Sequence, residues 1–529
     1  MGGTPPMSES ANLPPYFRPP LEYPDYAFHG LLKTACARRP DAIALVDGEV
    51  HMSFRELDAL SNACARAMLA AGVGIGDRVG LFLPNSAEFE IAVFGASKMG
   101  AVFTPMNPAY KKAEAAYQLN DSGAKILITT AEGAAVVREV QKELTALEAV
   151  IVTDEGAGDA RFADWIGAHS AETLPEPQID TAQDLIALPY SSGTTGLPKG
   201  VMLTHRNLVS NYHQCVANHY ITDRDSGLLF LPLYHIYGAL IMGALILAGA
   251  THVLMKRFTV PDALRLVEEH KLTLFYGVPP ALLAIAHHEN LGDYDLSSLR
   301  YIMSGAAPLP PEVRRVVQER TGVLTFMGYG LTEASPLTHM NPPVEEFIRE
   351  ESVGPPISDQ QQKIVDVETG TTELPVGEAG ELIIKGPHIM KGYWNAPEAT
   401  AEALRDGWLH TGDIGRMDEQ GYVYLMDRKK EMIKYKGFAV APAELEACLH
   451  LHPDVADAAV VPREDPEAGE IPVAFVVPKE GVQIDEEALM DFVNEKVAGY
   501  KHIRAVAFID AIPKSGSGKI LRRLLKEKA

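Results

Sequence analysis

Residues Ser191 to Gly200 read SSGTTGLPKG, a stretch with four hydroxyl side chains, three glycines and one lysine. Glycines let backbone N–H groups approach a ligand closely, hydroxyls donate to phosphate oxygens, and Lys199 adds positive charge. The GxxxxGK[ST] spacing of a Walker loop is absent. A plain polar turn needs only one or two glycines, so the stretch predicts a phosphate-binding loop instead.

Outward from this loop, short β-rich runs alternate with helical patterns from Asp41 onward. Ser53 and Glu56 form a capping box, which predicts a helix start. The expected helices lie near 54–68 and 86–99, and the expected strands lie at 79–83, 101–105, 125–129 and 149–153. This alternation predicts an α/β fold, with mostly parallel sheets flanked by helices in a large N-terminal domain.

Beyond Gly370 the pattern changes to strands and turns, with expected strands at 380–385 and 421–425. The segment from Asp427 to Glu431 is too charged for a core strand, so we place the domain boundary at Asp427 to Lys430. The residues after it have an α+β pattern, with expected helices at 442–451 and 485–497 and strands at 456–461 and 472–478. We therefore predict an N-terminal domain over 1–427, opening with a proline-rich arm over 1–25, and a small C-terminal domain over 428–529.

Composition excludes several classes of protein. The 529 residues include 47 Lys plus Arg against 70 Asp plus Glu, a formal net charge of −23, which argues against nucleic-acid binding. Four scattered cysteines without a CxxC pair suit a reducing compartment. The longest apolar stretch, from Gly238 to Ala250, has about 13 residues, too few to span a membrane. Because no secretory signal is visible at the N-terminus, we expect a cytoplasmic protein without a transmembrane segment.

A second chemical segment is GYGLTEAS, from Gly328 to Ser335. Magnesium prefers one or two carboxylates together with phosphate oxygens, so Glu333 is a candidate metal ligand and Thr332 a candidate phosphate donor. Taken alone, an exposed Thr-Glu after a turn is more often a helix start. In HTGDIG, Asp413 is either a turn residue or a carboxylate for ribose hydroxyls. Near the C-terminus, PKSGSGKILRR places Lys519 either in a functional Gly/Ser loop or in a solvated basic tail.

Together these segments resemble the acyl-adenylate-forming superfamily, which contains acyl-CoA synthetases, 4-coumarate-CoA ligases, beetle luciferases and peptide-synthetase adenylation domains. The resemblance runs from about Asp41 to Lys519. The segments that carry it are SSGTTGLPKG, SGAAPL, GYGLTE, GWLHTGD, DRKKEMIKYKG and SGSGK. It implies a large N-terminal domain that binds ATP and the acid, with a small mobile C-terminal domain. It also implies activation of a carboxylic acid as acyl-AMP, release of pyrophosphate and, in CoA ligases, transfer of the acyl group to CoA.

The resemblance also implies roles for individual residues. Lys519, His235, Lys434 and Glu333 would be catalytic, with Glu333 holding Mg²⁺, while Lys430 would be the hinge and Lys436 and Gly437 would line the CoA tunnel. The implied ATP- and AMP-binding residues are Ser191, Ser192, Gly193, Thr194, Thr195, Gly196, Lys199, Ala306, Ala307, Gly328, Tyr329, Gly330, Thr332, Asp413 and Arg428. The implied acyl pocket consists of Tyr237, Ile241, Met303, Ala306, Gly328, Pro336 and Leu337.

Several questions stay open at this level. The acid is expected to be apolar, either a fatty acid or an aryl or cinnamate-type acid, because none of the implied pocket residues is charged. The alternative for His235 is a structural histidine, hydrogen-bonded beside a packed strand. Ala439 replaces the glutamine that related CoA ligases commonly carry, which puts the efficiency of adenylation in doubt. An amino-acid-activating enzyme, a luciferase-like enzyme and an inactive nucleotide-binding module are the alternatives, and a homodimer is left open.

We predict that Lys519→Ala abolishes most acyl-AMP formation while CoA transfer from supplied acyl-AMP continues. A cation between the carboxylate and the α-phosphate screens two negative charges, and loss of such a donor costs about 100- to 1,000-fold in rate. Acid-dependent pyrophosphate release measures the first step, and thioester formation measures the second. Pyrophosphate release near the wild-type rate would contradict the assignment.

Overall fold

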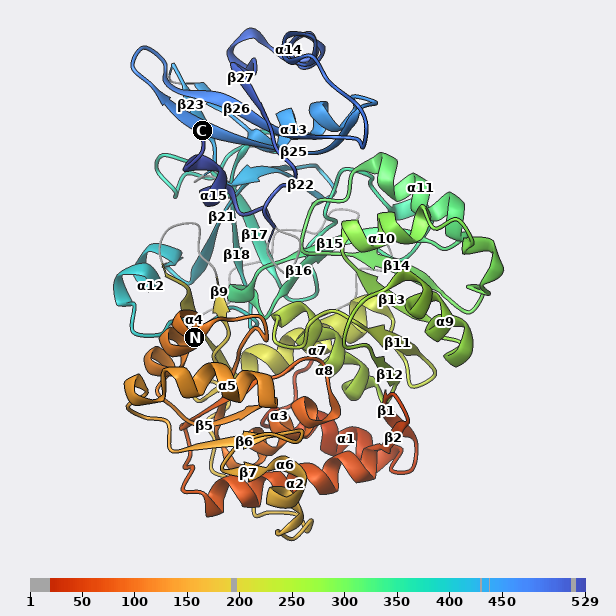
Figure 1. Ribbon diagram of the computed structural model, residues 1–529, viewed down its shortest axis with the longest axis vertical. Coiled ribbons are helices and arrows are strands. Elements are labelled where there is room, and N and C mark those ends of the chain that lie inside the picture. Colours follow the sequence, from red (N-terminus) through yellow and green to blue (C-terminus); the bar gives the residue numbers. More distant parts are fainter. Residues whose placement is uncertain (1–19, 192–196, 429–430, 437, 515–519) are drawn as a thin grey trace, which may run out of the picture.

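The computed structural model describes residues 20–191, 197–428, 431–436, 438–514 and 520–529 (Figure 1). Within these residues the first large sheet pairs its central strands, from β1 to β15, in parallel, and only the outermost strands pair antiparallel. In spatial order its strands are β16 (Leu337–Met340), β15 (Thr325–Gly330), β14 (Tyr301–Ser304), β13 (Leu274–Gly277), β11 (Ser226–Leu229), β12 (Thr251–Leu254), β1 (Ile43–Asp47) and β2 (Val50–Ser53).

The second large sheet is parallel from β8 to β7 and becomes antiparallel at β10, where the sequence SSGTTGLPKG enters the sheet. Its strands in spatial order are β19 (Gly392–Tyr393), β10 (Lys199–Thr204), β8 (Leu185–Ala187), β4 (Val102–Pro105), β3 (Arg78–Phe82), β5 (Ala124–Thr129), β6 (Ala149–Val152) and β7 (Ala160–Arg161), with β9 (Tyr190–Ser191) beside β10.

Two smaller sheets follow toward the C-terminus, in the upper part of Figure 1. The third sheet is antiparallel and the fourth is antiparallel except for β27 beside β26. The third contains β17 (Gln361–Val365), β18 (Gly380–Lys385), β21 (Trp408–Met417), β20 (Leu404–Arg405) and β22 (Val423–Arg428). The fourth contains β24 (Phe438–Val440), β23 (Ile433–Tyr435), β26 (Gly469–Pro478), β25 (Val455–Asp465) and β27 (Ala505–Phe508).

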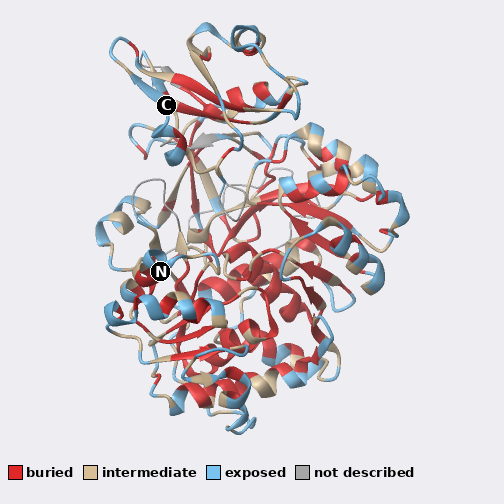
Figure 2. Ribbon diagram, in the orientation of Figure 1, coloured by how far each residue is buried: buried red, intermediate tan, exposed pale blue. Residues whose placement is uncertain are grey.

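Helices cover the faces of these sheets. One shared core lies between the two large sheets and buries α1 (Gly30–Arg38), α2 (Phe54–Ala70), α3 (Ala87–Met99), α7 (His205–His219) and α8 (Ile236–Ala248) (Figure 2). The outer faces are covered by α9 (Val260–His270), α10 (Pro279–Ala286) and α11 (Pro311–Thr321) on the first sheet, and by α4 (Lys112–Ser122) and α5 (Ala131–Glu139) on the second. The remaining helices are α6 (Phe162–Gly167), α12 (Pro397–Ala403), α13 (Pro442–His450), α14 (Glu486–Asn494) and α15 (Arg522–Lys526).

This architecture confirms the predicted α/β fold with a large, parallel-rich N-terminal part and a smaller C-terminal part. The capping box at Ser53 and Glu56 is present at the start of α2. One boundary was wrong, because the strand expected to end at 425 begins at Val423 and continues to Arg428. Charged residues are compatible with this position because β22 pairs along its length with β21, bridges to Gly354 at Val423, and lies at the margin of its sheet. The domain boundary at 427/428 stays a prediction.

The expected proline-rich arm is described only from residue 20, and residues 20–25 form neither helix nor strand. Both the backbone N–H of Leu21 and the hydroxyl of Tyr23 donate to Asp359 Oδ2, at 2.9 and 2.5 Å. The end of the arm is therefore fixed to the body of the molecule.

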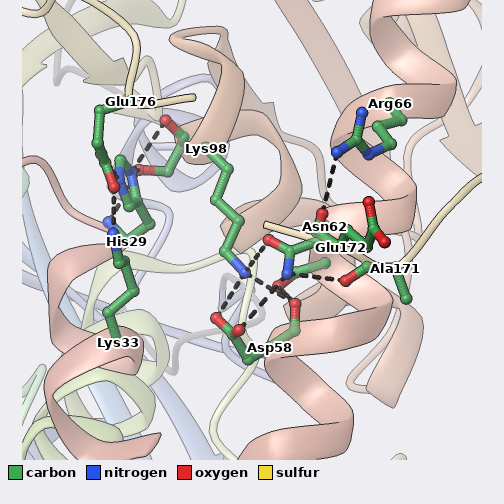
Figure 3. Close-up of polar contacts among 11 residues, drawn as sticks. His29, Lys33, Asp58, Asn62, Arg66, Lys98, Ala171, Glu172 and Glu176 are labelled. Carbon is green, nitrogen blue, oxygen red and sulfur yellow. Dashed lines mark hydrogen bonds and ion pairs between the residues drawn. The ribbon is translucent and has the colours of Figure 1, made fainter. Parts of the chain in front are cut away.

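Polar contacts, some of them partly buried, fasten the segment between α6 and β8 to α1, α2 and α3 (Figure 3). The Lys98 ammonium is only 5% exposed and donates to the carbonyl and carboxylate oxygens of Asp58 and to Asn62 Oδ1, at 2.7–2.8 Å. Glu176, from the connecting segment, accepts from His29 Nε2 at 2.8 Å. The buried charge of Lys98 is therefore paired, as a stable core requires.

Close packing of α7 against α8 gives a test of this core. A Cβ at Gly243 would lie 2.0 Å from the ring of Tyr212, whereas a Cβ at Gly167 would meet nothing within 4 Å. We predict that Gly243→Ala lowers the free energy of unfolding by about 1–3 kcal/mol because the core becomes overpacked. Gly167→Ala, the matched helix-glycine control, should change it by less than about 1 kcal/mol. Urea unfolding of both variants measures the difference, and equal stability would contradict the packing argument.

Candidate active site

Glu333 is held by segments from three parts of the chain. It lies in a short 3₁₀ helix, Thr332–Ala334, directly after β15, and is partly buried. Its Oε1 accepts from Ser191 Oγ at 3.2 Å and from the Tyr393 hydroxyl at 2.8 Å. Its second carboxylate oxygen receives neither of these two hydrogen bonds. The structure therefore brings the predicted metal ligand to the base of the predicted phosphate-binding loop.

Lys199 lies at the same place. It begins β10 and pairs in register with Ser191 of β9. Its Nζ is 5.6 Å from the centre of the Tyr393 ring, a cation–π distance. A positive charge, a carboxylate and two hydroxyls thus meet at the paired ends of β9 and β10.

Hydrogen bonds from residues outside the predicted site hold β9 and β10, the two strands that form the stem of the predicted loop. The Tyr190 hydroxyl donates to Asp121 Oδ2 at 2.6 Å. The Trp394 indole donates to the carbonyl oxygen of Asp121 at 2.9 Å, and the backbone N–H of Trp394 donates to Gly200 O at 2.8 Å. These contacts hold both strands of the stem against α4 and against the segment that carries Tyr393.

Tyr329 and Asp413, predicted near adenine and ribose, contact each other directly. The Tyr329 hydroxyl donates to Asp413 Oδ2, and Asp413 is 5% exposed. The ring of His339 lies 5.8 Å from the ring of Tyr329, and burial lowers the pKa of His339 to about 4, which keeps it neutral at pH 7. In the backbone, Asp413 of β21 is paired with Arg428 of β22. The residues implied for the nucleoside therefore converge.

The predicted acyl residues gather where α8 meets the C-terminal ends of β14 and β15. His235 is the N-cap of α8, and its Nδ1 accepts from the backbone N–H of Tyr237 at 3.3 Å. A Cβ at Gly305 would lie 2.9 Å from the Tyr237 ring, so only glycine leaves room for that ring. A Cβ at Gly328 would lie 2.3 Å from Met303 Cε, and one at Gly330 would lie 2.2 Å from Pro336 O.

The other predicted acyl-pocket residues also lie in the interior of the protein. Ile241 and Leu337 are buried, at 0% and 4% exposure, and Ala306 packs against the same core. Ala306 has a positive φ of 68°, and with Ala307 it follows β14 directly. The wall expected from the sequence is thus apolar in the structure as well.

Two of the predicted C-terminal residues, Lys434 and Lys436, are described by the structure. Both are exposed: Lys434 lies in β23 of the fourth sheet, at the top of Figure 1, and Lys436 lies in the turn that follows β23. The backbone N–H of Lys434 donates to Glu470 Oε2 at 2.7 Å. The remaining predictions lie outside the described residues: Ser192, Gly193, Thr194, Thr195, Gly196, Lys430, Gly437 and Lys519. The side chains of Arg428 and Ala439 lie outside the description too.

Sequence reasoning missed Tyr393, Trp394, Asp121 and Tyr190. Tyr393 and Glu333 are 60 residues apart, and nothing in a single sequence links the two. The segment GYWNAPEAT, in which two aromatic residues follow a glycine and precede a proline, was the available signal. It is typical of an ordinary turn.

The sequence matches the family model for an AMP-binding enzyme over residues 32–394 and the model for the AMP-binding enzyme C-terminal domain over residues 444–519. The chain belongs to the AMP-binding enzyme family. This membership confirms the resemblance to the acyl-adenylate-forming superfamily.

Relatives within this family are similar over nearly the whole chain. Identity is 43% over 527 residues to 4-coumarate–CoA ligase 5 of Oryza sativa subsp. japonica, covering 96% of each sequence. It is 42% over 525 residues to 4-coumarate–CoA ligase of Pinus taeda, again covering 96% of each.

Solved structures of the family have the same fold. The anthranilate CoA ligase AuaEII in complex with anthranoyl-AMP superimposes with a TM-score of 0.87 at 30% identity, covering 96% of this chain and 97% of that one. ATP-bound MatB of Rhodopseudomonas palustris superimposes with a TM-score of 0.88 at 28% identity, covering 95% and 99%. Separately, no helix in the described ranges is both long and apolar enough to cross a membrane.

We predict that Tyr393→Phe weakens ATP binding about 10- to 100-fold, because the Glu333 carboxylate loses a donor worth about 1.5–3 kcal/mol. Tyr424→Phe is the matched control, since the Tyr424 hydroxyl donates to the carboxylate of Asp418 at 3.2 Å outside this site. Calorimetric titration with ATP and magnesium measures both. Equal affinities for the two variants would show that Tyr393 does not position Glu333.

Proposed function

We propose that the chain, an AMP-forming acid–CoA ligase, acts on 4-hydroxycinnamate-type acids. The observation that carries this proposal is the hydroxyl of Tyr237. It is buried at the predicted acyl wall, and it has no hydrogen-bond partner among the described residues. An unpaired buried hydroxyl is costly, so it calls for a partner such as the phenolic group of a substrate. The 4-coumarate–CoA ligases among the relatives support the same substrate class.

The rest of the wall supports an apolar monocarboxylate. Ile241, Met303 and Leu337 are at most 4% exposed, and none of them offers a partner for a second charge. Burying an unpaired ammonium or carboxylate costs several kcal/mol. The sequence His235-Ile236-Tyr237 carries no carboxylate that would pair with an α-amine, which disfavours an amino acid as substrate.

ATP and CoA are the expected cosubstrates, and the reaction has two steps. First, a carboxylate oxygen of the acid bonds to the α-phosphorus of ATP while the bond to pyrophosphate breaks. Then the sulfur of CoA bonds to the acyl carbon, the bond to AMP breaks, and the thiol proton is released. AMP is a better leaving group than the oxygen of the free carboxylate, because its phosphate stabilises the departing negative charge.

The family resemblance supports the following roles in the first step, and the convergence of Ser191, Lys199 and Glu333 agrees with them. Lys199 and the hydroxyls of the loop would hold the pyrophosphate end of ATP, with Thr332 at the α-phosphate. Tyr329 and Asp413 would hold the nucleoside, with Arg428 also on the ribose. Lys519 would bridge the acid carboxylate and the α-phosphate, where a cation screens two anions. His235 would stand at the carboxylate end of the acyl site.

Magnesium fits the site through Glu333. The described residues contain no group of three or more His, Cys, Asp or Glu that would hold a metal alone. Magnesium bound together with a nucleotide needs only one or two protein carboxylates, and Glu333 has one oxygen outside its two described hydrogen bonds. When bound, the ion would neutralise charge on the phosphates.

The second step requires a different face of the C-terminal domain. Lys434 lies in β23 of the fourth sheet and Lys436 in the turn that follows, and with Gly437 they would form the proposed CoA-tunnel face. We infer rotation about Lys430, which would exchange Lys519 for this face between the two steps. Ala439, in place of the common glutamine, would affect adenylation rather than thioester formation.

We predict that the protein prefers 4-coumarate to cinnamate, and that Tyr237→Phe removes most of this preference. A hydrogen bond to an otherwise unpaired hydroxyl is worth about 1–3 kcal/mol, or roughly 5- to 150-fold in kcat/KM. The control is Tyr212→Phe, which removes another buried hydroxyl without a described partner. Thioester formation is measured with 4-coumarate, cinnamate, octanoate, laurate, glutamate and phenylalanine. The pocket interpretation fails if glutamate or phenylalanine gives the highest kcat/KM, or if the 4-coumarate preference survives in Tyr237→Phe.

A further inference from the structure

A buried asparagine of the second large sheet makes its hydrogen bonds with the first. Asn85 lies between β3 and α3 and is only 4% exposed. Its Nδ2 donates to Leu229 O and to Leu231 O, each at 3.0 Å, and also lies 3.4 Å from Met255 O. Its Oδ1 accepts from the backbone N–H of Leu233 at 2.8 Å. The amide therefore uses both its donors and its acceptor on β11, on the end of β12 and on the connection that leads from β11 to α8.

Two of these hydrogen bonds flank a turn in that connection. Leu231 and Leu233 lie on either side of Pro232, whose carbonyl oxygen accepts from the backbone N–H of His235 at 3.0 Å. The first residue of the turn is thus held from both sides by the same amide of Asn85. The last residue, His235, is the N-cap of α8. The backbone of His235 is therefore fixed by the turn on one side and by the helix on the other.

Helix α8 packs directly on this turn. A Cβ at Gly238 would lie 2.3 Å from Pro232 O, so the helix reaches the turn only because this position is glycine. The first turn of α8 also carries Tyr237, a residue of the predicted acyl wall. A displacement of the turn would therefore move His235 together with the start of the helix.

The backbone that carries Asn85 is itself well anchored. Ser86 is the N-cap of α3, and its side chain accepts from the backbone N–H of Phe89 at 3.3 Å. The backbone N–H of Ala87 donates to Asp47 Oδ2, at the end of β1, at 3.2 Å. The amide is thus mounted on a fixed base, and it determines where the turn lies.

The partners of Asn85 require an amide at this position. Three of them are carbonyl oxygens and one is an N–H group, so the side chain must donate at one atom and accept at the other. An aspartate would bury a charge and place an oxygen against carbonyl oxygens. An apolar residue would leave buried backbone groups without their partner, which is costly. Either change would favour a displaced turn.

We propose that Asn85 is a positioning residue that holds His235 at the carboxylate end of the acyl site. Hydrogen bonds behind a reacting group keep it in its productive orientation, and a small displacement is costly in rate. Asn85 would act through the turn and through His235, without contacting the acid itself. The inference rests on the role that the proposed function gives to His235.

The test measures the binding of two compounds to the full-length protein by calorimetry. One is 4-coumaroyl-sulfamoyl adenosine, a non-hydrolysable mimic of the acyl-AMP, and the other is AMP, which lacks the acyl part. Asn85→Ala should weaken binding of the coumaroyl compound about tenfold and change that of AMP by less than about twofold. A general loosening of the fold would weaken both compounds alike.

A double-mutant cycle shows whether the effect passes through His235. His235→Ala should itself weaken binding of the coumaroyl compound. In that background Asn85→Ala should cost less than about twofold more, because the side chain that it positions is already absent. Equal losses in the two backgrounds would overturn the proposal. So would wild-type binding by folded Asn85→Ala or by His235→Ala.

Asn62→Ala is the matched control. Asn62 is also a buried asparagine, 3% exposed, and its Nδ2 donates to Ala171 O at 3.1 Å, outside the candidate active site (Figure 3). This variant should unfold at a lower urea concentration yet keep the wild-type ratio of the two affinities. Asn85→Ser, which leaves room for a water molecule, replaces Asn85→Ala if the latter does not fold, and it should also weaken coumaroyl binding. The same loss of coumaroyl binding in Asn62→Ala would contradict the positioning role.

The outcome is separable from the proposed function. A wild-type protein that shows the expected cycle but forms no CoA thioester with 4-coumarate would refute the proposed substrate class and retain the role of Asn85. Formation of 4-coumaroyl-CoA, together with equal losses in the two backgrounds, would retain the proposed function and refute the positioning role.

Discussion

The carboxylate of Glu333 is the point on which the arrangement of the site depends. A partly buried carboxylate needs donors, and here they come from Ser191 of the second sheet and Tyr393 of its outermost strand. Glu333 itself follows the first sheet. One charged group therefore joins the two large sheets at the place where the predicted phosphate-binding residues Ser191 and Lys199 lie, and Ser191 is the first residue of the predicted phosphate-binding loop.

A second link joins these sheets to the third. Tyr329, at the end of β15, donates to Asp413 in β21, so the first and third sheets meet at the proposed nucleoside site. Asp413 is nearly inaccessible, and a buried carboxylate is stable only with such a donor. The same contacts that would recognise a nucleotide also determine how the sheets are placed relative to one another.

Local signals in the sequence predicted much of the fold. The capping box at Ser53 and Glu56 and the alternation of strands and helices were sufficient for the α/β class and for several element boundaries, since both depend on short-range geometry. The site was predicted residue by residue only where it resembled a family motif. Tyr393 and Trp394 escaped because their partners are set by the tertiary fold. The hydrogen bond between the hydroxyls of Tyr276 and Tyr301 also depends on the register between β13 and β14, which the pattern of a single strand does not contain.

The pairing of β10 with β19 has a consequence for synthesis on the ribosome. Val201 pairs with Tyr393, so the strand that carries Lys199 waits for a partner made about 190 residues later. At about 5–20 residues per second, this delay is roughly 10–40 s. During that time one edge of β10 has unpaired N–H and C=O groups, which is the kind of edge that recruits foreign strands. A nascent chain of this protein therefore has its greatest need of a chaperone after the N-terminal sheets have emerged and before Gly392 and Tyr393 leave the exit tunnel.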